Sequence, residues 1–402
     1  MDRSPAQYLV PVRSEQLQPG MYVAELDRSW LHAPFPATGF LITDRSQIEQ
    51  LRRLCHHVYV DAALSEPLPA DLGADSQDRP RPGGAPQDAG GRLARARGAL
   101  SAALDAVAGI VRDARHRAGI DGAAVAASAG SLAEQVSLDA AMLHCCLRTE
   151  EHGGYLCRRA VGTAVVATML ARQLGLDRQT LQEVATGALL LDLGKIAVPV
   201  PILAKPGALV AGEQAYVRHH VERGLGLLAG AGLPERAVEM IAAHHERSDG
   251  SGYPLELRGT AIPVFGRLAA IADVYDAMTL NRRYAAAMSP SAALRQLQGL
   301  GGEKFDAALV GELVRALGTY PTGTLVELDD GCVGLVHAGP ARDPLQPEVL
   351  LTHDAQRRPL AVPVVVATGG AVQVFRALPP GAVRIAPAAL DAAPDWPRRA
   401  SA

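Results

Sequence analysis

Apolar and polar positions near the start of the chain follow two different patterns. Residues 21–26 alternate as in a β-strand, whereas the apolar side chains of residues 46–54 recur at helical spacing. One strand and one helix so close together predict a small α+β module at residues 1–64, which is the size of a minimal domain. Trp30 and Phe35 either fill the core of this module or form a partner surface, and the usual burial of aromatic side chains favours the core.

The pattern changes after this module. Residues 65–91 are rich in Pro and Gly and contain no aromatic residue, which predicts a disordered linker. Residues 92–318 are rich in Ala and Leu, which recur at helical spacing over long segments separated by short breaks at Gly or Pro. This pattern predicts an all-α bundle.

A second change follows Tyr320. Short apolar runs, separated by Asp-Asp-Gly and Gly-Gly turns, indicate strands at residues 324–328, 333–337, 349–353 and 364–368. Residues 319–402 should therefore form a small β-rich appendage and tail. The expected fold class is mainly α, with a helical bundle flanked by a small α+β module and a small β appendage.

Length and charge narrow the classes of function. A chain of 402 residues is too long for one ordinary core, and a hydrophobic content of 48% supports two or three domains. The 39 basic and 42 acidic residues leave a formal net charge of −3, so no nucleic acid polymer is expected as a partner. An anionic ligand would have to be bound by a local group of residues.

Cysteine usage and hydropathy bear on the compartment. The five cysteines are odd in number and lack CxxC spacing, which argues against a disulfide framework and against a zinc knuckle. A reducing cytoplasm is the simplest compartment. The most apolar stretch, residues 184–204, is interrupted by charged residues and prolines, so neither a membrane span nor a signal peptide is predicted.

Candidate chemistry is concentrated in one motif of the bundle. His244 and His245 are adjacent near the end of a helix predicted at residues 235–246, and a Gly-Tyr-Pro turn follows at residues 252–254. A helix directs two consecutive side chains to two metal ions only if both ions lie near its end. Neutral imidazoles suit Fe, Mn or Zn, and two ions roughly 3.5 to 4 Å apart can clamp a phosphodiester while activating a water. The pair therefore predicts a binuclear centre.

This motif and an upstream Leu-Leu-Asp-Leu-Gly-Lys segment at residues 190–195 resemble the HD-GYP family. Members of that family are bacterial hydrolases of cyclic di-GMP with two metal ions inside a helical bundle. Residues 20–61 are similar to a module often found ahead of HD-GYP domains. The resemblance implies metal ligation by Asp192, His220, His244, His245 and Asp273. It also implies a catalytic role for Asp192 and Lys195, and substrate contacts from Lys195, Arg282, Gly252, Tyr253 and Pro254.

Departures from the family pattern concern the same site. Leu191 stands where the family has the histidine of its HD pair, and the register places Arg159 where the family has its first histidine. A guanidinium about 4 Å from a cation is repelled by roughly 4 kcal/mol per unit charge at an effective dielectric of about 20. Arg159 could instead pair with Asp192 or Asp273. We therefore expect one metal ion or none instead of two. Residues 285–286 are alanines where the family has basic side chains, which should weaken phosphate binding.

Two functions are compatible with this sequence. The favoured one is a protein of bacterial cyclic di-GMP signalling with impaired or lost phosphodiesterase activity, because two-metal clamping needs both ions. Such a protein would act as a nucleotide-sensing or protein-interaction module. The alternative is an active metal-dependent phosphodiesterase that hydrolyses cyclic di-GMP to pGpG or GMP. Without metal, the retained Asp and His side chains would form a hydrogen-bonded network.

The partners expected from the resemblance follow from both functions. They are cyclic di-GMP or a related nucleotide and a signalling protein. A second copy of the chain in a homodimer is a further alternative.

Overall fold

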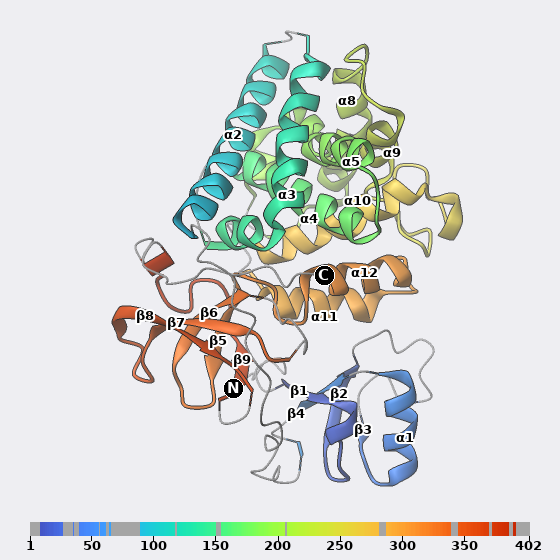
Figure 1. The fold of residues 1–402 in the computed structure, drawn as a ribbon. Coiled ribbons are helices and arrows are strands. Elements are labelled where there is room, and N and C mark those ends of the chain that lie inside the picture. The colour runs from blue at the N-terminus through green and yellow to red at the C-terminus, as the bar shows by residue number, and fades with distance from the viewer. Residues whose placement is uncertain are drawn as a thin grey trace. The chain divides into compact units, whose positions relative to one another are not determined.

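The computed structural model describes residues 9–26, 35, 40–55, 57–61, 64–65, 89–116, 119–149, 154–205, 207–280, 287–338, 345–369, 372–385 and 389–390. The described residues form two compact units (Figure 1). One is drawn from Met1–Ala89, Ser289–Gly302 and Gly318–Ala402, and the other from Gly90–Met288 and Glu303–Leu317. Helices predominate and small sheets occur towards both ends of the chain, which confirms the predicted mainly α class.

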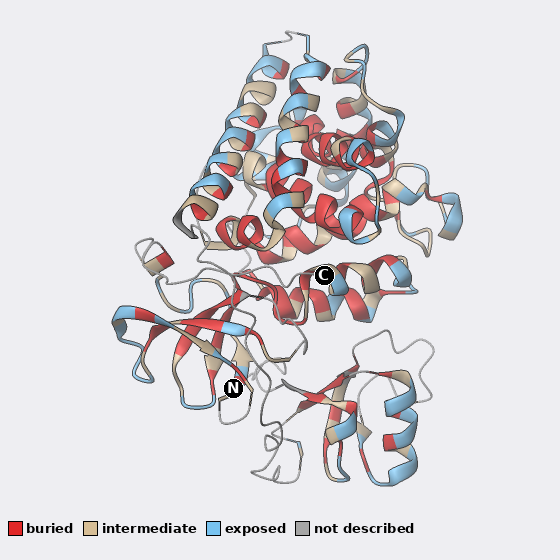
Figure 2. Ribbon diagram, viewed as in Figure 1, coloured by how far each residue is buried: buried red, intermediate tan, exposed pale blue. Residues whose placement is uncertain are grey.

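The second unit is helical. Its longer helices are α2 (Ala89–Arg115), α3 (Gly122–Thr149), α4 (Tyr155–Gln173), α5 (Arg178–Leu190), α7 (Ala211–Arg218), α8 (His220–Leu227), α9 (Glu235–Ala243), α10 (Val264–Thr279) and α12 (Ala307–Leu317). Its described residues also include the short helical segments η4 (Leu193–Ala197), α6 (Val200–Leu203) and η5 (Gly259–Ala261). Helices α4, α5 and α10 are buried along most of their length, as the red ribbons of Figure 2 show. The core of this unit therefore lies among these helices.

Small residues allow the central helices to approach one another closely. On α5, a Cβ added to Gly187 would lie 2.9 Å from the Cα of Ala237 and 2.9 Å from the sulfur of Met240 on α9. On α10, a Cβ added to Gly266 would lie 2.5 Å from the Cβ of Ala243. Real side chains do not pack at such distances, so the contact of α9 with both neighbouring helices depends on glycine.

The N-terminal sheet has the order β1 (Leu9–Arg13), β4 (His57–Asp61), β2 (Tyr22–Leu26) and β3 (Phe40–Leu41), and every pair is antiparallel. Helix α1 (Arg45–Leu54) begins with a capping box in which Asp44 accepts hydrogen bonds from the backbone of Ser46 and Gln47. The ring of Phe35 stacks on Phe40 at a centroid distance of 4.4 Å and packs against the core of this sheet. For Phe35 this agrees with the predicted core position, whereas Trp30 lies outside the described residues.

The C-terminal sheet is antiparallel with the order β8 (Pro359–Ala367), β7 (Glu348–His353), β6 (Val333–Ala338), β5 (Leu325–Leu328) and β9 (Val374–Ala377). Helix α11 (Pro290–Leu300) is grouped with the same unit. Four strands match the predicted runs. The strand β8 begins earlier than expected, at Pro359, which has no backbone N–H to donate and is tolerated at the first residue of an edge strand. The four-residue strand β9 was not predicted, because so short a run carries little periodicity.

The domain boundaries at residues 1–64, 65–91, 92–318 and 319–402 stay a prediction. Helix α2 begins at Ala89, and residues 66–88 of the expected linker lie outside the described residues. Among the helices that the structure describes, none is both long and apolar enough to cross a membrane.

Adding one methyl group at Gly187 should weaken the helical unit. Overpacking of a tight core contact typically costs about 1–3 kcal/mol. We expect Gly187→Ala to lower the free energy of unfolding by that amount in urea denaturation. The matched control is Gly98→Ala on α2, where an added Cβ meets nothing within 4 Å. There the change should be neutral or stabilising by roughly 0.5–1 kcal/mol, because alanine favours helices. Equal effects of the two substitutions would contradict the packing argument.

Candidate metal centre

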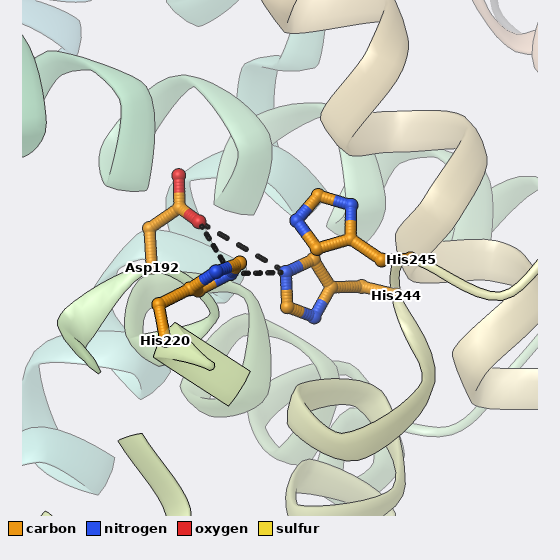
Figure 3. A group of neighbouring side chains, drawn as sticks. All are labelled: Asp192, His220, His244 and His245. Atoms are coloured by element: carbon orange, nitrogen blue, oxygen red, sulfur yellow. Dashed lines mark hydrogen bonds and ion pairs between the residues drawn. The ribbon is translucent and has the colours of Figure 1, made fainter. Parts of the chain in front are cut away.

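Four side chains from three segments of the helical unit converge on one point (Figure 3). Asp192 follows α5 and precedes η4, His220 is the first residue of α8, and His244 and His245 directly follow α9. Each side chain offers one nitrogen or oxygen, and these four atoms all lie within 4.8 Å of one another. We call these residues the Asp-His group. His220 and His244 are fully buried, and Asp192 is 7% exposed.

Backbone carbonyls fix the orientation of two of the imidazoles. The Nδ1 atoms of His220 and His244 lie 2.8 Å and 2.9 Å from backbone carbonyl oxygens of the preceding turns. A carbonyl only accepts, so each Nδ1 carries the proton and donates it, and each Nε2 keeps a free lone pair. The two Nε2 atoms are 3.4 Å apart, and Oδ1 of Asp192 lies 3.4 Å and 3.9 Å from them. Three lone pairs therefore face one another.

The local electrostatics keep these lone pairs free of protons. Burial, followed by the charge of Lys195, lowers the pKa of His220 to about 4. Burial also lowers the pKa of His244, and it lowers the pKa of His245 well below its usual value. Burial alone would raise the pKa of Asp192, but the charge of Lys195, the interaction with His220 and the charge of Arg159 lower it overall. Near neutral pH, the group therefore presents neutral imidazoles and an ionised carboxylate.

This donor set fits a single divalent cation. Among the described residues, Oδ1 of Asp192 and Nε2 of His245 are buried and have no hydrogen-bond partner. Unpaired buried polar atoms are costly unless a ligand or an ion satisfies them. Three imidazoles and one carboxylate are ligands that suit Fe, Mn or Zn. Lys195 holds the other carboxylate oxygen of Asp192, with its Nζ 2.6 Å from Oδ2, and so orients Asp192 toward the histidines.

The fifth predicted ligand, Asp273, lies outside the Asp-His group. Its carboxylate forms an ion pair with Arg159, whose Nη1 also donates to the backbone oxygen of Asp273 at 3.1 Å. The same Nη1 lies 2.7 Å from Oδ2 of Asp276, and Arg148 donates to Oδ1 of that carboxylate at 2.7 Å. We call Arg148, Arg159, Asp273 and Asp276 the arginine network. The pairing of Arg159 with Asp273 is one of the two pairings expected from the sequence.

The Gly-Tyr-Pro turn lies against the histidine pair. The ring of Tyr253 stacks on His245 at a centroid distance of 4.6 Å, and the guanidinium of Arg218 lies 5.0 Å above the Tyr253 ring. A Cβ added to Gly252 would lie 2.4 Å from the backbone nitrogen of Arg247, so only glycine allows the turn to come so close. The turn is therefore a wall of the site.

The role of Glu246 in this turn was not predicted. Its buried carboxylate accepts hydrogen bonds from the backbone nitrogens of Leu255 at 2.7 Å and Leu257 at 3.0 Å. The helix expected to continue to Glu246 ends at Ala243, and the prediction of its end was wrong. His244 caps the helix with its N–H bonded to the carbonyl of Met240, and the N–H of Glu246 then donates to the carbonyl of Ala243 in a tight turn. A carboxylate just beyond the histidines was the only sequence signal.

Several predicted substrate contacts remain predictions. Gly252, Tyr253 and Pro254 lie on the turn described above, and Lys195 is bound to Asp192. Arg282 lies outside the described residues, as do residues 285–286.

The comparisons with known proteins agree with this architecture. The family model of the HD domain matches residues 141–309, and a domain of unknown function (DUF3391) matches residues 9–125. The bundle and its site define an HD-domain protein. A cyclic di-GMP phosphodiesterase of Pseudomonas aeruginosa is 32% identical over 372 residues, which cover 90% of this chain and 89% of that protein. The chain belongs to the HD-GYP family, as its motif predicts.

Other similar proteins match shorter or more distant regions. The cyclic di-GMP phosphodiesterase response regulator RpfG of Xanthomonas campestris is 41% identical over 152 residues, covering 37% of this chain and 40% of that protein. Among solved structures, an HDG"Y"P protein of Bdellovibrio bacteriovorus covers 77% of this chain and 99% of its own, with 16% identity and a TM-score of 0.47.

Removing the carboxylate of Glu246 should loosen the turn beside the histidines. Glu246→Ala removes the acceptor of two part-buried backbone N–H groups, and each lost hydrogen bond costs about 0.5–1.5 kcal/mol. We expect urea denaturation to show a loss of this size and limited proteolysis to cleave faster after Arg258. The exposed Glu303 serves as the control, since Glu303→Ala should change neither measurement. Unchanged proteolysis of Glu246→Ala would contradict the role assigned to this carboxylate.

Proposed function

We propose that this chain is a nucleotide-sensing or protein-interaction module of bacterial cyclic di-GMP signalling whose phosphodiesterase activity is impaired or lost. The observation that carries the proposal is the engagement of Asp273 by Arg159. This arginine stands where the family resemblance places a metal-binding histidine, and Leu191 stands at a second such position. A two-ion site would need ligands at these positions, and this chain offers a guanidinium and an alkyl group instead.

One divalent ion is the cofactor that the remaining residues support. Asp192, His220, His244 and His245 would hold it, with Fe, Mn or Zn as the candidates. When bound, such an ion supplies Lewis acidity and a fixed positive charge for an anionic ligand. The clamping of a phosphodiester between two ions is not supported, because the donor set fits one ion.

The proposed ligand is cyclic di-GMP or a related nucleotide. Relatives that match this chain carry names as cyclic di-GMP phosphodiesterases, which supports this class of ligand. The formal net charge of the chain is −3, so phosphate groups need local cations. Lys195 contacts Asp192 of the Asp-His group, and Arg218 lies over the Tyr253 ring. Arg282 is a further candidate from the sequence. The Tyr253 ring is half-buried between His245 and Arg218, and the cations near it suit the phosphates of a nucleotide.

The alternative is an active phosphodiesterase that opens cyclic di-GMP to pGpG or GMP. The retained residues favour it. Asp192 and three histidines suffice to hold one ion, and the ammonium group of Lys195 lies next to that site. We rank it second, since a single ion leaves one of the two reacting oxygens without a metal partner.

Metal binding should depend on His220 but not on its neighbour His219. We expect purified chain reconstituted with Mn²⁺, Fe²⁺ or Zn²⁺ to retain one ion per chain in elemental analysis. His220→Asn should lose most of the bound metal. Losing a residue that only orients a ligand lowers metal affinity by roughly 10- to 100-fold, and losing a direct ligand should lower it further. The control is His219→Asn, an exposed neighbour whose Nδ1 lies 2.7 Å from the backbone oxygen of Ala215. Equal metal content in both variants would contradict the assigned site.

Nucleotide binding should persist without efficient turnover. Calorimetry with cyclic di-GMP should show binding, and chromatography should show little pGpG or GMP after long incubation with each metal. Lys195→Ala should weaken binding by roughly 10- to 100-fold, if its charge-assisted hydrogen bond contributes about 1.5–3 kcal/mol. Robust metal-dependent turnover would establish the active phosphodiesterase instead. Absence of binding would contradict the sensing role.

A further inference from the structure

The arginine network is a group of four charged side chains between α3, α4 and α10. Arg148 and Arg159 contribute two positive charges, and Asp273 and Asp276 contribute two negative ones. The side chain of Asp276 is fully buried, and Arg159 is 5% exposed. Each oxygen of Asp276 is bound by a different arginine. The network is therefore neutral as a whole only when Arg159 is present.

The charge on Arg159 is maintained by its neighbours. Burial opposes the charged form, but the carboxylates of Asp273 and Asp276 outweigh burial and raise the pKa of the guanidinium. Asp192 contributes in the same direction, so this positive charge also acts on the Asp-His group. The guanidinium is thus a permanent cation beside the candidate metal centre.

The backbone of α4 is shaped to admit this network. A Cβ added to Gly162, one turn after Arg159, would lie 2.2 Å from Oδ1 of Asp276 and 2.8 Å from its Cγ. A larger residue at this position would displace the carboxylate that Arg148 and Arg159 share. The helix therefore provides the cation at one turn and the space for its counter-ion at the next.

We propose that Arg159 is a built-in cation that takes the place of a second metal ion and neutralises Asp273 and Asp276 permanently. The inference rests on the proposed function, which assigns one ion to the Asp-His group. The other half of the site then needs no metal, and the contact between α4 and α10 is complete in metal-free protein. Adding metal ions to the metal-free protein would change the Asp-His group and leave the arginine network unchanged.

Chemical rescue in metal-free protein tests the inference. In full-length chain treated with EDTA, Arg159→Ala should lower Tm on the order of 10 °C, because it leaves buried carboxylates without a counter-charge. Millimolar guanidinium chloride or, after removal of EDTA, manganese chloride should restore part of this loss, relative to sodium chloride at equal ionic strength. The matched control is Arg92→Ala, which removes a partly buried ion pair with Asp139. The stability lost in Arg92→Ala should not be restored, because water reaches this ion pair, whose side chains are 13% and 11% exposed.

A second pair of variants separates charge from packing if Arg159→Ala fails to fold. Arg159→Lys keeps a positive charge and Arg159→Met has a similar length without charge. The lysine variant should be the more stable of the two in EDTA. Equal Tm values for these variants, or no rescue of Arg159→Ala by either cation, would overturn the inference.

Counting ions in the wild-type chain distinguishes this inference from the proposed function. One ion per chain agrees with both. Two ions per chain with Arg159 in place would overturn the inference. No ion at all would overturn the metal assignment of the proposed function, while the measurements in EDTA decide the role of Arg159 independently.

Discussion

The helical unit depends on the compensation of buried charge where α4 meets α10. Arg159 on α4 faces Asp273 and Asp276 on α10, and all three side chains are almost removed from water. Removing one partner from such a pair leaves an uncompensated charge, which costs roughly 3–5 kcal/mol. Helix α10 also packs against α9, which ends at the histidine pair. The position of the histidine pair therefore depends, through the packing of α9 on α10, on the ion pairs of Arg159, although no histidine takes part in them.

The Asp-His group is compensated in a different way. Backbone carbonyls hold the protons of His220 and His244 on Nδ1, so the facing Nε2 atoms carry lone pairs toward Asp192. A metal-free hydrogen-bonded network would need a proton between these atoms. Burial opposes such protonation by lowering the pKa of each histidine. The hydrogen-bonded alternative considered from the sequence is therefore less favourable than an ion near neutral pH, since only a cation satisfies all three lone pairs at once.

Much of this arrangement could be predicted from the sequence, because periodicity and the Gly-Tyr-Pro motif are local signals. The bundle, four C-terminal strands and the approach of Asp192 to three histidines follow from such signals. The arginine network could be anticipated only in part. Arg159 was singled out because it replaces a histidine, whereas Arg148 and Asp276 lie 128 positions apart and share no motif. Their pairing depends on how α3 and α10 pack, which no sequence period records. The role of Glu246 was missed for a similar reason, since its partners are backbone nitrogens of a loop.

A guanidinium and a metal ion neutralise the same carboxylates with different consequences. Arginine stays charged, presents a planar fork of donors and cannot be exchanged or removed by a chelator. It also cannot lower the pKa of a bound water as a metal ion does. Replacing an ion by Arg159 therefore preserves the electrostatic requirement of the fold and gives up the chemistry of that position. The histidines, by contrast, retain an exchangeable position. The proposed assignment of one permanent and one exchangeable cation is consistent with the proposed sensing role, because the fold would not depend on the species that is sensed.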